Sequence, residues 1–159
     1  MPKQYYKVES YHSRKSIGYL MRRGRNLITA QVQDIFRQKP GLDGVSFVHW
    51  VVLMCLRDDL ANTLTEISQY VCYDAGALTR VIDQMEERGL LKRKRSGKDR
   101  RVVELKLTRE GRKVVESLIF IVVDYYNDLL RDFTHEEVNI LLQLLTRLVG
   151  KLDAVRDGS

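Results

Sequence analysis

The chain has 159 residues, of which 44% are apolar and 30% are charged, and it contains only two prolines. This composition excludes a disordered or fibrous protein and is typical of one helix-rich domain spanning residues 1–159. The longest apolar runs, at residues 50–56 and 118–123, are much shorter than the roughly 20 residues of a membrane span, and the first residues show no signal-peptide core. We therefore expect a cytoplasmic protein without a membrane segment.

The net charge of +6 is concentrated in two short stretches. Residues 1–30 contain seven lysines or arginines and one acidic residue, and residues 92–101 have the same balance, whereas the rest of the chain is acidic. Concentrated positive charge is typical of a surface that binds a polyanion, although an exposed charged face is the more frequent meaning of a single basic run. The role of the first stretch stays open.

Apolar residues at helical spacing predict a long first helix over residues 13–36 and a second helix over residues 46–56, which begins at a serine that can cap it. Two further helices, over residues 64–71 and 74–88, are separated by only two residues, which is the spacing of a helix-turn-helix. The fourth helix begins at an aspartate suited to cap it, and Gly89 is suited to end it.

After the fourth helix the period of the apolar residues changes to two, which predicts a strand over residues 102–107 paired with a strand over residues 90–95. Residues 96–99 supply the turn of this hairpin, and two helices follow, over residues 108–131 and 134–152. The predicted fold class is mainly α with a small β-hairpin wing (α+β). The long terminal helices present more apolar surface than the central part can cover, which favours a dimer.

No arrangement of residues predicts catalysis, a metal site or a cofactor site. His12, His49 and His135 lie far apart, and the sequence contains neither a Cys-x-x-Cys pair nor the motifs of metalloproteases and serine hydrolases. The tripeptide at residues 96–98 is similar to part of a phosphate-binding loop, but the spacing to the preceding glycine and the following Asp99 do not fit that motif. We expect no enzyme.

The helix over residues 74–88 has the features of a helix that reads duplex DNA. Its first turns carry Gly76 and Ala77, whose small size permits close approach, followed by Thr79 and Arg80, which can reach phosphates or base edges. Glycine inside a helix costs on the order of 1 kcal/mol relative to alanine, so Gly76 requires a reason such as close approach of its backbone to a partner. The alternative is an ordinary amphipathic helix with one buried face.

The hairpin is the most basic part of the chain, and its charges repel one another when no anionic partner is present. Arginine at such a tip suits a narrow minor groove, where the negative potential of DNA is deepest. Asp99 does not contradict this pattern, because its carboxylate can hold the guanidinium of Arg101 in a fixed orientation. The hairpin residues that we expect to contact DNA are Lys94, Arg95, Ser96, Lys98, Asp99, Arg100 and Arg101.

The hairpin and the helices before it resemble those of the MarR family of transcriptional regulators. Residues 99–108 match the family's wing signature, an Asp-x-Arg followed by an alternating strand and Leu-Thr. Residues 64–67, 78–82 and 87–91 match its helix-turn-helix in order and spacing. The likeness rests on specific residues in these segments, whereas over the rest of residues 13–152 only the order of the predicted elements agrees.

The resemblance implies a homodimer that binds a pseudo-palindromic operator in double-stranded DNA, and we interpret the protein as a repressor. A winged helix-turn-helix lobe over residues 45–108 would contact DNA. Helices over residues 13–38 and 109–153 would flank this lobe and form the dimer.

Carried over residue by residue, the resemblance puts Arg101 in the minor groove with Asp99 orienting it, and Thr79 and Arg80 in the major groove. At the position of Gly76 the family often has a small hydroxyl residue that touches DNA. We therefore expect this chain to lack that contact.

The resemblance also implies a small effector, often a phenol or an aromatic acid, bound between the dimerisation helices and the DNA-binding lobe. The candidates are Tyr19, Met21 and Arg23 of the first helix and His49 and Trp50 of the second, because an arginine and a histidine beside aromatic rings can hold a carboxylate and a ring. The alternative assigns Met21 and Trp50 to the core, Arg23 to the surface and His49 to a partly exposed position.

Two other functions stay open. Redox-sensing relatives use a reactive cysteine near the start of the first helix, where this chain has none. Cys72, between the third and fourth helices, is a candidate for such a switch, and an inert core thiol is the alternative for both Cys72 and Cys55. The other possibility is a winged-helix module that binds an acidic protein, which the salt dependence of DNA binding would distinguish from a regulator.

Overall fold

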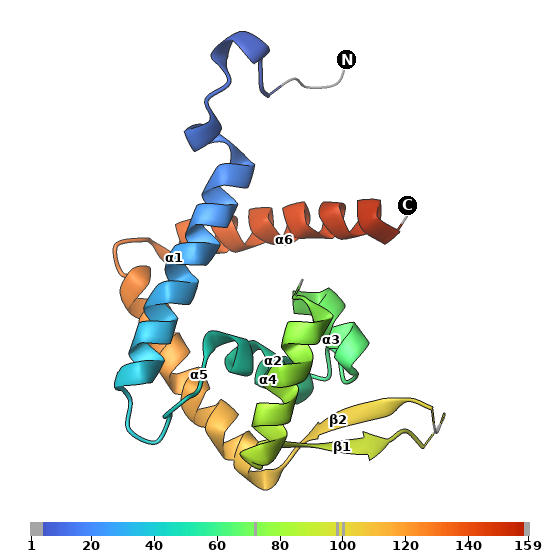
Figure 1. Cartoon of the computed structure of the whole chain (residues 1–159). Helices are drawn as coiled ribbons and strands as arrows, with labels where there is room; N and C mark the ends of the chain where they lie inside the picture. Colours follow the sequence, from blue (N-terminus) through green and yellow to red (C-terminus); the bar gives the residue numbers. More distant parts are fainter. Residues whose placement is uncertain (1–4, 72, 98, 100, 158–159) are drawn as a thin grey trace. The chain divides into compact units, whose positions relative to one another are not determined.

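The computed structural model describes residues 5–71, 73–97, 99 and 101–157, and it forms two compact units, residues 1–119 and 120–159. Helix α5 begins in the first unit and ends in the second, and the two strands form an antiparallel hairpin (Figure 1). The expectation of a mainly α fold with one hairpin is confirmed. The elements are the 3-10 turns Val8–Ser10 and Ser13–Lys15, α1 (Ile17–Gln38), α2 (Phe47–Arg57), α3 (Leu64–Val71), α4 (Ala75–Glu87), β1 (Leu91–Arg95), β2 (Val103–Leu107), α5 (Arg109–Leu129) and α6 (His135–Asp157).

Helix α1 begins four residues later than the apolar spacing predicts. Ser16 caps it by accepting a hydrogen bond from the Tyr19 N–H (3.2 Å), and residues 13–15 form a separate 3-10 turn. The predicted start is therefore wrong, because an N-cap overrides the periodicity of the residues before it. The helix ends at Gln38, and Lys39, directly before the proline, has extended dihedrals.

Hydrogen bonds between neighbouring residues define the helix-turn-helix. The Ser68 hydroxyl of α3 donates to the Tyr73 carbonyl (2.7 Å), which closes the turn. Asp74 caps α4 by accepting a hydrogen bond from the Ala77 N–H (2.8 Å). Gly89 follows the end of α4 with a φ of +67°, a conformation that favours glycine. Both predicted caps of α4 are confirmed.

Strands β1 and β2 pair with Leu91 opposite Leu107, and each begins one residue later than predicted. Leu105 and Leu107 are buried, as the alternation predicts, whereas Val103 is 45% exposed because it lies nearer the tip. The Leu105 N–H also donates to the Asn62 carbonyl (2.7 Å). The segment before α3 thus adds a short edge to the hairpin, which periodicity alone does not predict.

Buried apolar side chains from α1 to α5 form the core of the first unit, and each contributes about 1.5–3 kcal/mol when it is removed from water. Helix α4 contributes three of them from one face. Burial of that face leaves the opposite face of α4 in contact with solvent. The largest fully buried side chains are Phe36, Leu53, Ile67, Leu78, Ile82, Met85, Leu91 and Leu118.

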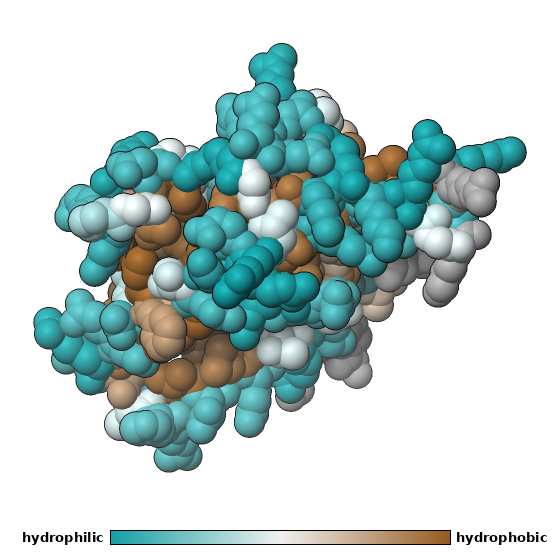
Figure 2. Space-filling model, turned by 90° about the horizontal axis from the view of Figure 1, so that it is seen from below, coloured by the Kyte–Doolittle hydropathy of each residue, from teal (hydrophilic) through white to brown (hydrophobic). Residues whose placement is uncertain are grey.

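Apolar side chains also reach the surface of both units. Figure 2 shows one face of the molecule, on which apolar surface lies between hydrophilic side chains. Monomeric proteins rarely expose large apolar patches, so these faces are suited to contact another protein. The exposed apolar residues of α1 are Ile17, Leu20, Met21 and Leu27, and those of α6 are Ile140, Leu141, Leu142, Leu144, Leu145, Val149, Leu152 and Val155. In the described part of the chain, none of the helices is long and apolar enough to cross a bilayer.

The first turn of α5 lies against the backbone that joins α4 to β1. The Thr108 N–H donates to the Leu90 carbonyl (3.1 Å), and the Thr108 hydroxyl donates to the Gly89 carbonyl (2.6 Å). The same hydroxyl accepts a hydrogen bond from the Gly111 N–H (3.0 Å). A Cβ atom at Gly111 would lie 1.9 Å from the Leu90 carbonyl oxygen, so only glycine fits there.

We predict that Gly111→Ala destabilises the protein by about 3 kcal/mol, because the added methyl group overlaps a backbone carbonyl that cannot move independently. Urea unfolding at a fixed protein concentration measures the change. Gly97→Ala is the matched control, since a Cβ atom at Gly97 would have no described atom within 4 Å. Equal stability of Gly111→Ala and the wild type would show that the close approach does not constrain the fold.

Candidate nucleic-acid interface

Helix α4 buries one face and presents the other to solvent. Gly76 and Arg80 are exposed, and Ala77 and Thr79 are half-buried. Leu78 is fully buried on the opposite face. The four residues of α4 predicted to approach DNA therefore lie on its exposed face or at the edge of that face.

The side chain of Thr79 is held by its own helix. Its hydroxyl donates a hydrogen bond to the Ala75 carbonyl, four residues earlier (2.8 Å). With its hydrogen engaged, the oxygen can accept a hydrogen bond from a base amino group but cannot donate one to a phosphate. In this conformation, Arg80 is the residue in the first turns of α4 whose side chain can donate hydrogen bonds to DNA.

Gly76 is not required by its surroundings within the chain. A Cβ atom there would lie 3.2 Å from the Asp74 carboxylate oxygen, and that flexible side chain is the only neighbour within 4 Å among the described residues. The φ of Gly76 is not in the left-handed region. Among the described residues, an alanine at this exposed position would therefore press only on the Asp74 oxygen that caps α4.

Arg93 of β1 binds two carboxylates of α4. One guanidinium nitrogen donates to Asp83 (2.6 Å) and another to Glu86, and the Arg93 backbone N–H also donates to Glu86 (3.0 Å). These contacts from Arg93 hold the pKa of the Glu86 carboxyl below its usual value. Arg93, which contributes to the positive charge of the hairpin, is therefore neutralised within the protein.

Backbone hydrogen bonds shape the turn of the wing, by which we mean β1, β2 and the residues between them. The Asp99 carboxylate accepts a hydrogen bond from the backbone N–H of Arg101 (2.9 Å), and the Asp99 carbonyl accepts one from the Val102 N–H (3.0 Å). The expected contact of Asp99 with the Arg101 guanidinium is therefore corrected: Asp99 orients the backbone of Arg101, and the exposed side chain extends from that backbone. Lys98 and Arg100 lie outside the described residues.

Ser96 is buried, although we expected it to face DNA. A hydrogen bond from its side chain lowers the pKa of the Glu104 carboxyl, with a smaller effect from the Lys106 ammonium group. Ser96 therefore joins the two strands at the tip in the free protein. Lys94 and Arg95 are exposed, and within the described residues neither forms an ion pair.

The residues predicted to bind an effector divide into two groups. On α1, the Arg23 guanidinium donates to the Tyr19 hydroxyl (3.2 Å), and Met21 is exposed. On α2, Trp50 is half-buried and His49 is buried. No hydrogen bond or ion pair within the described ranges joins the α1 group to the α2 group.

His49 is held as a neutral, buried imidazole. Its Nδ1 accepts a hydrogen bond from the Ser46 N–H (2.9 Å), in a capping box where a glutamate is more usual. Its Nε2 is buried and has no hydrogen-bond partner among the described residues. Burial, with a smaller contribution from the Arg88 charge, lowers the pKa of His49 to about 4. The alternative that His49 is partly exposed is therefore wrong, since its side chain caps a helix that packs into the core.

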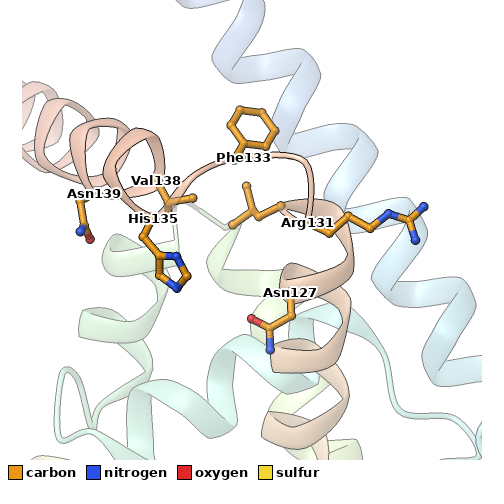
Figure 3. A pocket seen from close by; sticks show the side chains of 7 residues that line it. Asn127, Arg131, Phe133, His135, Val138 and Asn139 are labelled. Atoms are coloured by element: carbon orange, nitrogen blue, oxygen red, sulfur yellow. The ribbon is translucent and has the colours of Figure 1, made fainter.

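The described surface includes hollows of about 300, 280 and 350 Å³. The first lies at the turn between α5 and α6 in the second unit, and Figure 3 shows that Arg131 extends away from His135 and Asn127 there. The second is lined by the end of α2 and by β2, and the third by residues 25–33 of α1. None of the five residues predicted to bind an effector lines any of these hollows.

The thiol of Cys55 is buried in α2. Burial, together with the nearby Asp58 carboxylate, raises the pKa of this thiol, which disfavours the reactive thiolate. Cys55 is therefore a core thiol, as the inert alternative predicts, and Cys72 lies outside the described residues. In the ranges that the structure describes, no group of three or more His, Cys, Asp or Glu residues could hold a metal ion.

The positive charge of the hairpin does not predict the ion pairs of Arg93, although the sequence contains a signal for them. Asp83 and Glu86 are three residues apart, so they lie on one face of α4. Arg93 lies two residues after the buried Leu91, so it lies on the same face of β1. Two acidic residues on a helix beside a strand with an inward-facing arginine predict an ion pair.

Comparisons with known proteins agree with this architecture. The sequence profile of the MarR family matches residues 45–103. The uncharacterized HTH-type transcriptional regulator YwoH of Bacillus subtilis is 35% identical over 94 residues, which cover 59% of this chain and 68% of YwoH.

Solved structures with a similar fold include those of MarR and BpsR. Wild-type MarR of Escherichia coli, in its apo form, has a TM-score of 0.70 and 26% identity, covering 84% of this chain and 96% of that one. BpsR of Bordetella bronchiseptica, whose DNA binding is regulated by 6-hydroxynicotinic acid, has a TM-score of 0.70 and 27% identity, covering 87% of this chain and 96% of that one.

We predict that acid destabilises the protein through His49. Its pKa is about 4 in the folded state and 6.5 in an unfolded chain, so folding excludes a proton between these values. The stability is fully present above pH 6.5 and falls by at most about 1.4 kcal/mol per pH unit toward pH 4. Urea unfolding at pH 7 and pH 5, at one protein concentration, measures the loss.

His49→Gln removes the titrating group, so its stability should change less between pH 7 and pH 5 than that of the wild type. His135→Gln, at an exposed histidine of α6, is the control and should retain the full pH dependence. If His49→Gln retains the wild-type slope, another group causes the acid sensitivity.

Proposed function

Because the chain belongs to the MarR family of transcriptional regulators, we propose that it is a repressor that binds a pseudo-palindromic DNA operator as a homodimer and is released by a small effector. Members of this family bind DNA and usually act as dimers, and the relatives are regulators, not enzymes. The observation that carries the proposal is the combination of an exposed, small-residue face on α4 with an exposed arginine on a backbone-fixed wing.

We propose that residues 45–108 form the DNA-binding lobe. In this interpretation, Gly76 and Ala77 permit close approach of α4 to the major groove, where Thr79 accepts a hydrogen bond and Arg80 donates to a phosphate or base. The backbone hydrogen bond from Arg101 to Asp99 supports a fixed starting direction for the Arg101 side chain.

The wing would supply the remaining contacts. Arg101 would enter the minor groove, and the exposed Lys94 and Arg95 would neutralise phosphates beside it. Lys98 and Arg100 stay predictions, since they lie outside the described residues.

We propose that residues 13–38 and 109–153 form the dimer. The exposed apolar side chains of α1 and of α6 support this assignment, because burial against a second copy would remove them from water. Two lobes related by twofold symmetry would then match an operator with two related half-sites.

The effector, in our proposal, is a small aromatic or phenolic acid. The buried Nε2 of His49 supports this class, because a neutral imidazole whose Nδ1 accepts a hydrogen bond carries its proton on Nε2 and can donate it to a ligand oxygen. Tyr19, Met21, Arg23 and Trp50 would complete the site. The regulation of BpsR by 6-hydroxynicotinic acid is an example of this ligand class in a protein of similar fold.

We predict that Arg101→Ala abolishes specific retention of operator DNA in a mobility-shift assay, because the minor-groove contact and its counterion release are lost. The DNA would be a fragment recovered with the purified protein. Arg37→Ala is the control, since Arg37 is an exposed arginine of α1 that pairs only with Asp34 (3.0 Å) among the described residues. Equal retention by Arg101→Ala and Arg37→Ala would overturn the wing assignment.

We also predict that Gly76→Ala weakens DNA binding while the stability of the protein changes by less than about 1 kcal/mol. Alanine favours the helix by up to about 1 kcal/mol, and this gain is opposed by the 3.2 Å approach of the new Cβ atom to the Asp74 oxygen that caps α4. Thermal unfolding and fluorescence anisotropy with operator DNA measure the two effects. Undiminished DNA affinity would show that the backbone of Gly76 does not approach DNA closely.

A further inference from the structure

We infer that Arg93 is a positioning residue, which holds the wing at a fixed angle to α4 through Asp83 and Glu86 and does not itself contact DNA. The inference rests on the proposed function, because it explains how the two parts of a DNA-binding lobe keep one relative orientation. It assigns a role to the single wing arginine that binds acidic residues of α4 within the described structure.

The geometry of the contact fixes both the direction of the Arg93 side chain and the rotation of its guanidinium plane. The two terminal nitrogens of the planar guanidinium bind different carboxylates, which lie on successive turns of α4, and Glu86 also binds the Arg93 backbone N–H. A planar group bound at two points cannot rotate about one of them. A lysine has one charged nitrogen without this planar fork, so it cannot reproduce the arrangement.

Among the described residues of β1, Arg93 is the one farthest from the core that binds α4. Nearer the core, Leu91 and Leu107 hold the root of the hairpin by burial. Beyond Arg93, the strand residues Lys94 and Arg95 are exposed. On the other edge of the hairpin, the Asn62 carbonyl holds β2 through the Leu105 N–H (2.7 Å). Without Arg93 the hairpin would keep this attachment but lose its outermost link to α4, so its angle to α4 would no longer be fixed.

The length of the wing amplifies any change at this contact. A strand rises about 3.3 Å per residue, so the turn lies roughly 10 Å beyond Arg93, and a tilt of about 10° moves the turn by roughly 2 Å. A shift of this size exceeds the range of about 0.5 Å over which hydrogen-bond distances vary, so a contact that is aligned before the tilt is lost after it. With α4 in the major groove, the backbone of Arg101 would then be displaced from the position at which its side chain enters the adjacent minor groove.

The charges around Arg93 oppose a phosphate contact at the same place. One arginine and two carboxylates have a net charge of −1, and the terminal nitrogens of Arg93 are already engaged. A phosphate that approached Arg93 would be repelled by Asp83 and Glu86. The contribution of Arg93 to DNA binding is therefore geometric.

The effect on folding should be small. The side chains of Asp83 and Arg93 are 51% and 33% exposed, and ion pairs in such positions contribute little to stability. Variants at these positions should fold, and thermal unfolding verifies this for each of them. If Arg93→Ala does not fold, Glu86→Gln still tests the inference, because it leaves the pair between Arg93 and Asp83 in place.

The experiment measures the affinity of full-length variants for a recovered operator fragment by fluorescence anisotropy over a range of KCl concentrations. For Arg93→Ala we expect affinity to fall by about tenfold or more, with an unchanged slope of log affinity against log salt, because no phosphate contact is lost. Arg93→Lys should not restore the affinity. Arg95→Ala, at an exposed arginine two residues along the same strand, is the matched control and should reduce the slope by about one for each protomer.

Glu86→Gln separates a positioning role from a simple effect of charge. Removal of a negative charge near DNA should strengthen binding if charge alone matters. Glutamine has one acceptor oxygen in place of two, so the variant loses one of the two hydrogen bonds from Arg93, and this loss should weaken binding. We expect weaker specific binding by about threefold or more. Unchanged or tighter binding by Glu86→Gln, or a reduced salt slope for Arg93→Ala, would overturn the inference.

Failure of the inference can be distinguished from failure of the proposed function by Arg101→Ala in the same assay. If Arg101→Ala loses the operator while Arg93→Ala and Glu86→Gln retain it, the inference alone is wrong. If Arg101→Ala also binds as the wild type does, the wing does not read DNA and the proposed function is wrong in its main contact.

Discussion

The carbonyl group of Leu90 joins the three elements on which the proposed DNA contacts depend. It accepts the Thr108 N–H (3.1 Å) and occupies the space that a side chain at Gly111 would need. Thr108 also binds the carbonyl of Gly89, where the chain leaves α4. The end of α4, the start of β1 and the first turn of α5 are thus in direct backbone contact, and none of them can move without the others.

Features that depend on neighbours along the chain were predictable from the sequence. Ser46, Asp74 and Gly89 perform the capping roles that their residue types indicate, because a cap needs only the residues within one turn. The predicted start of α1 is wrong because Ser13 and Ser16 can both cap a helix, and the periodicity of the apolar residues does not distinguish them. The added edge at Asn62 was missed because a contact between distant segments leaves no local pattern.

The candidate site was predictable in outline but not in the partner of each side chain. The sequence pattern includes Arg93 among the positive charges of the hairpin and predicts that Ser96 and Asp99 contact DNA. In the structure each of the three contacts the protein itself: Arg93 binds α4, Ser96 binds Glu104, and Asp99 binds the backbone of Arg101. Composition locates a basic wing, but only the three-dimensional arrangement separates the charges available to a partner from those already paired.

The short distance between Arg93 and Asp83 also has a consequence for how well the protein would distinguish its operator from other DNA. The guanidinium nitrogen and the carboxylate oxygen are 2.6 Å apart within one folded chain, so the pair forms without displacing ions from DNA. Binding of exposed wing residues to phosphates releases ions that are condensed on DNA, and added salt opposes that release. Added salt therefore weakens the phosphate contacts more than it weakens the pair that orients the wing. In the proposed complex, ionic strength would reduce binding to arbitrary sequences before it disturbs the geometry that recognises one sequence, so discrimination would be better at physiological salt than in dilute buffer.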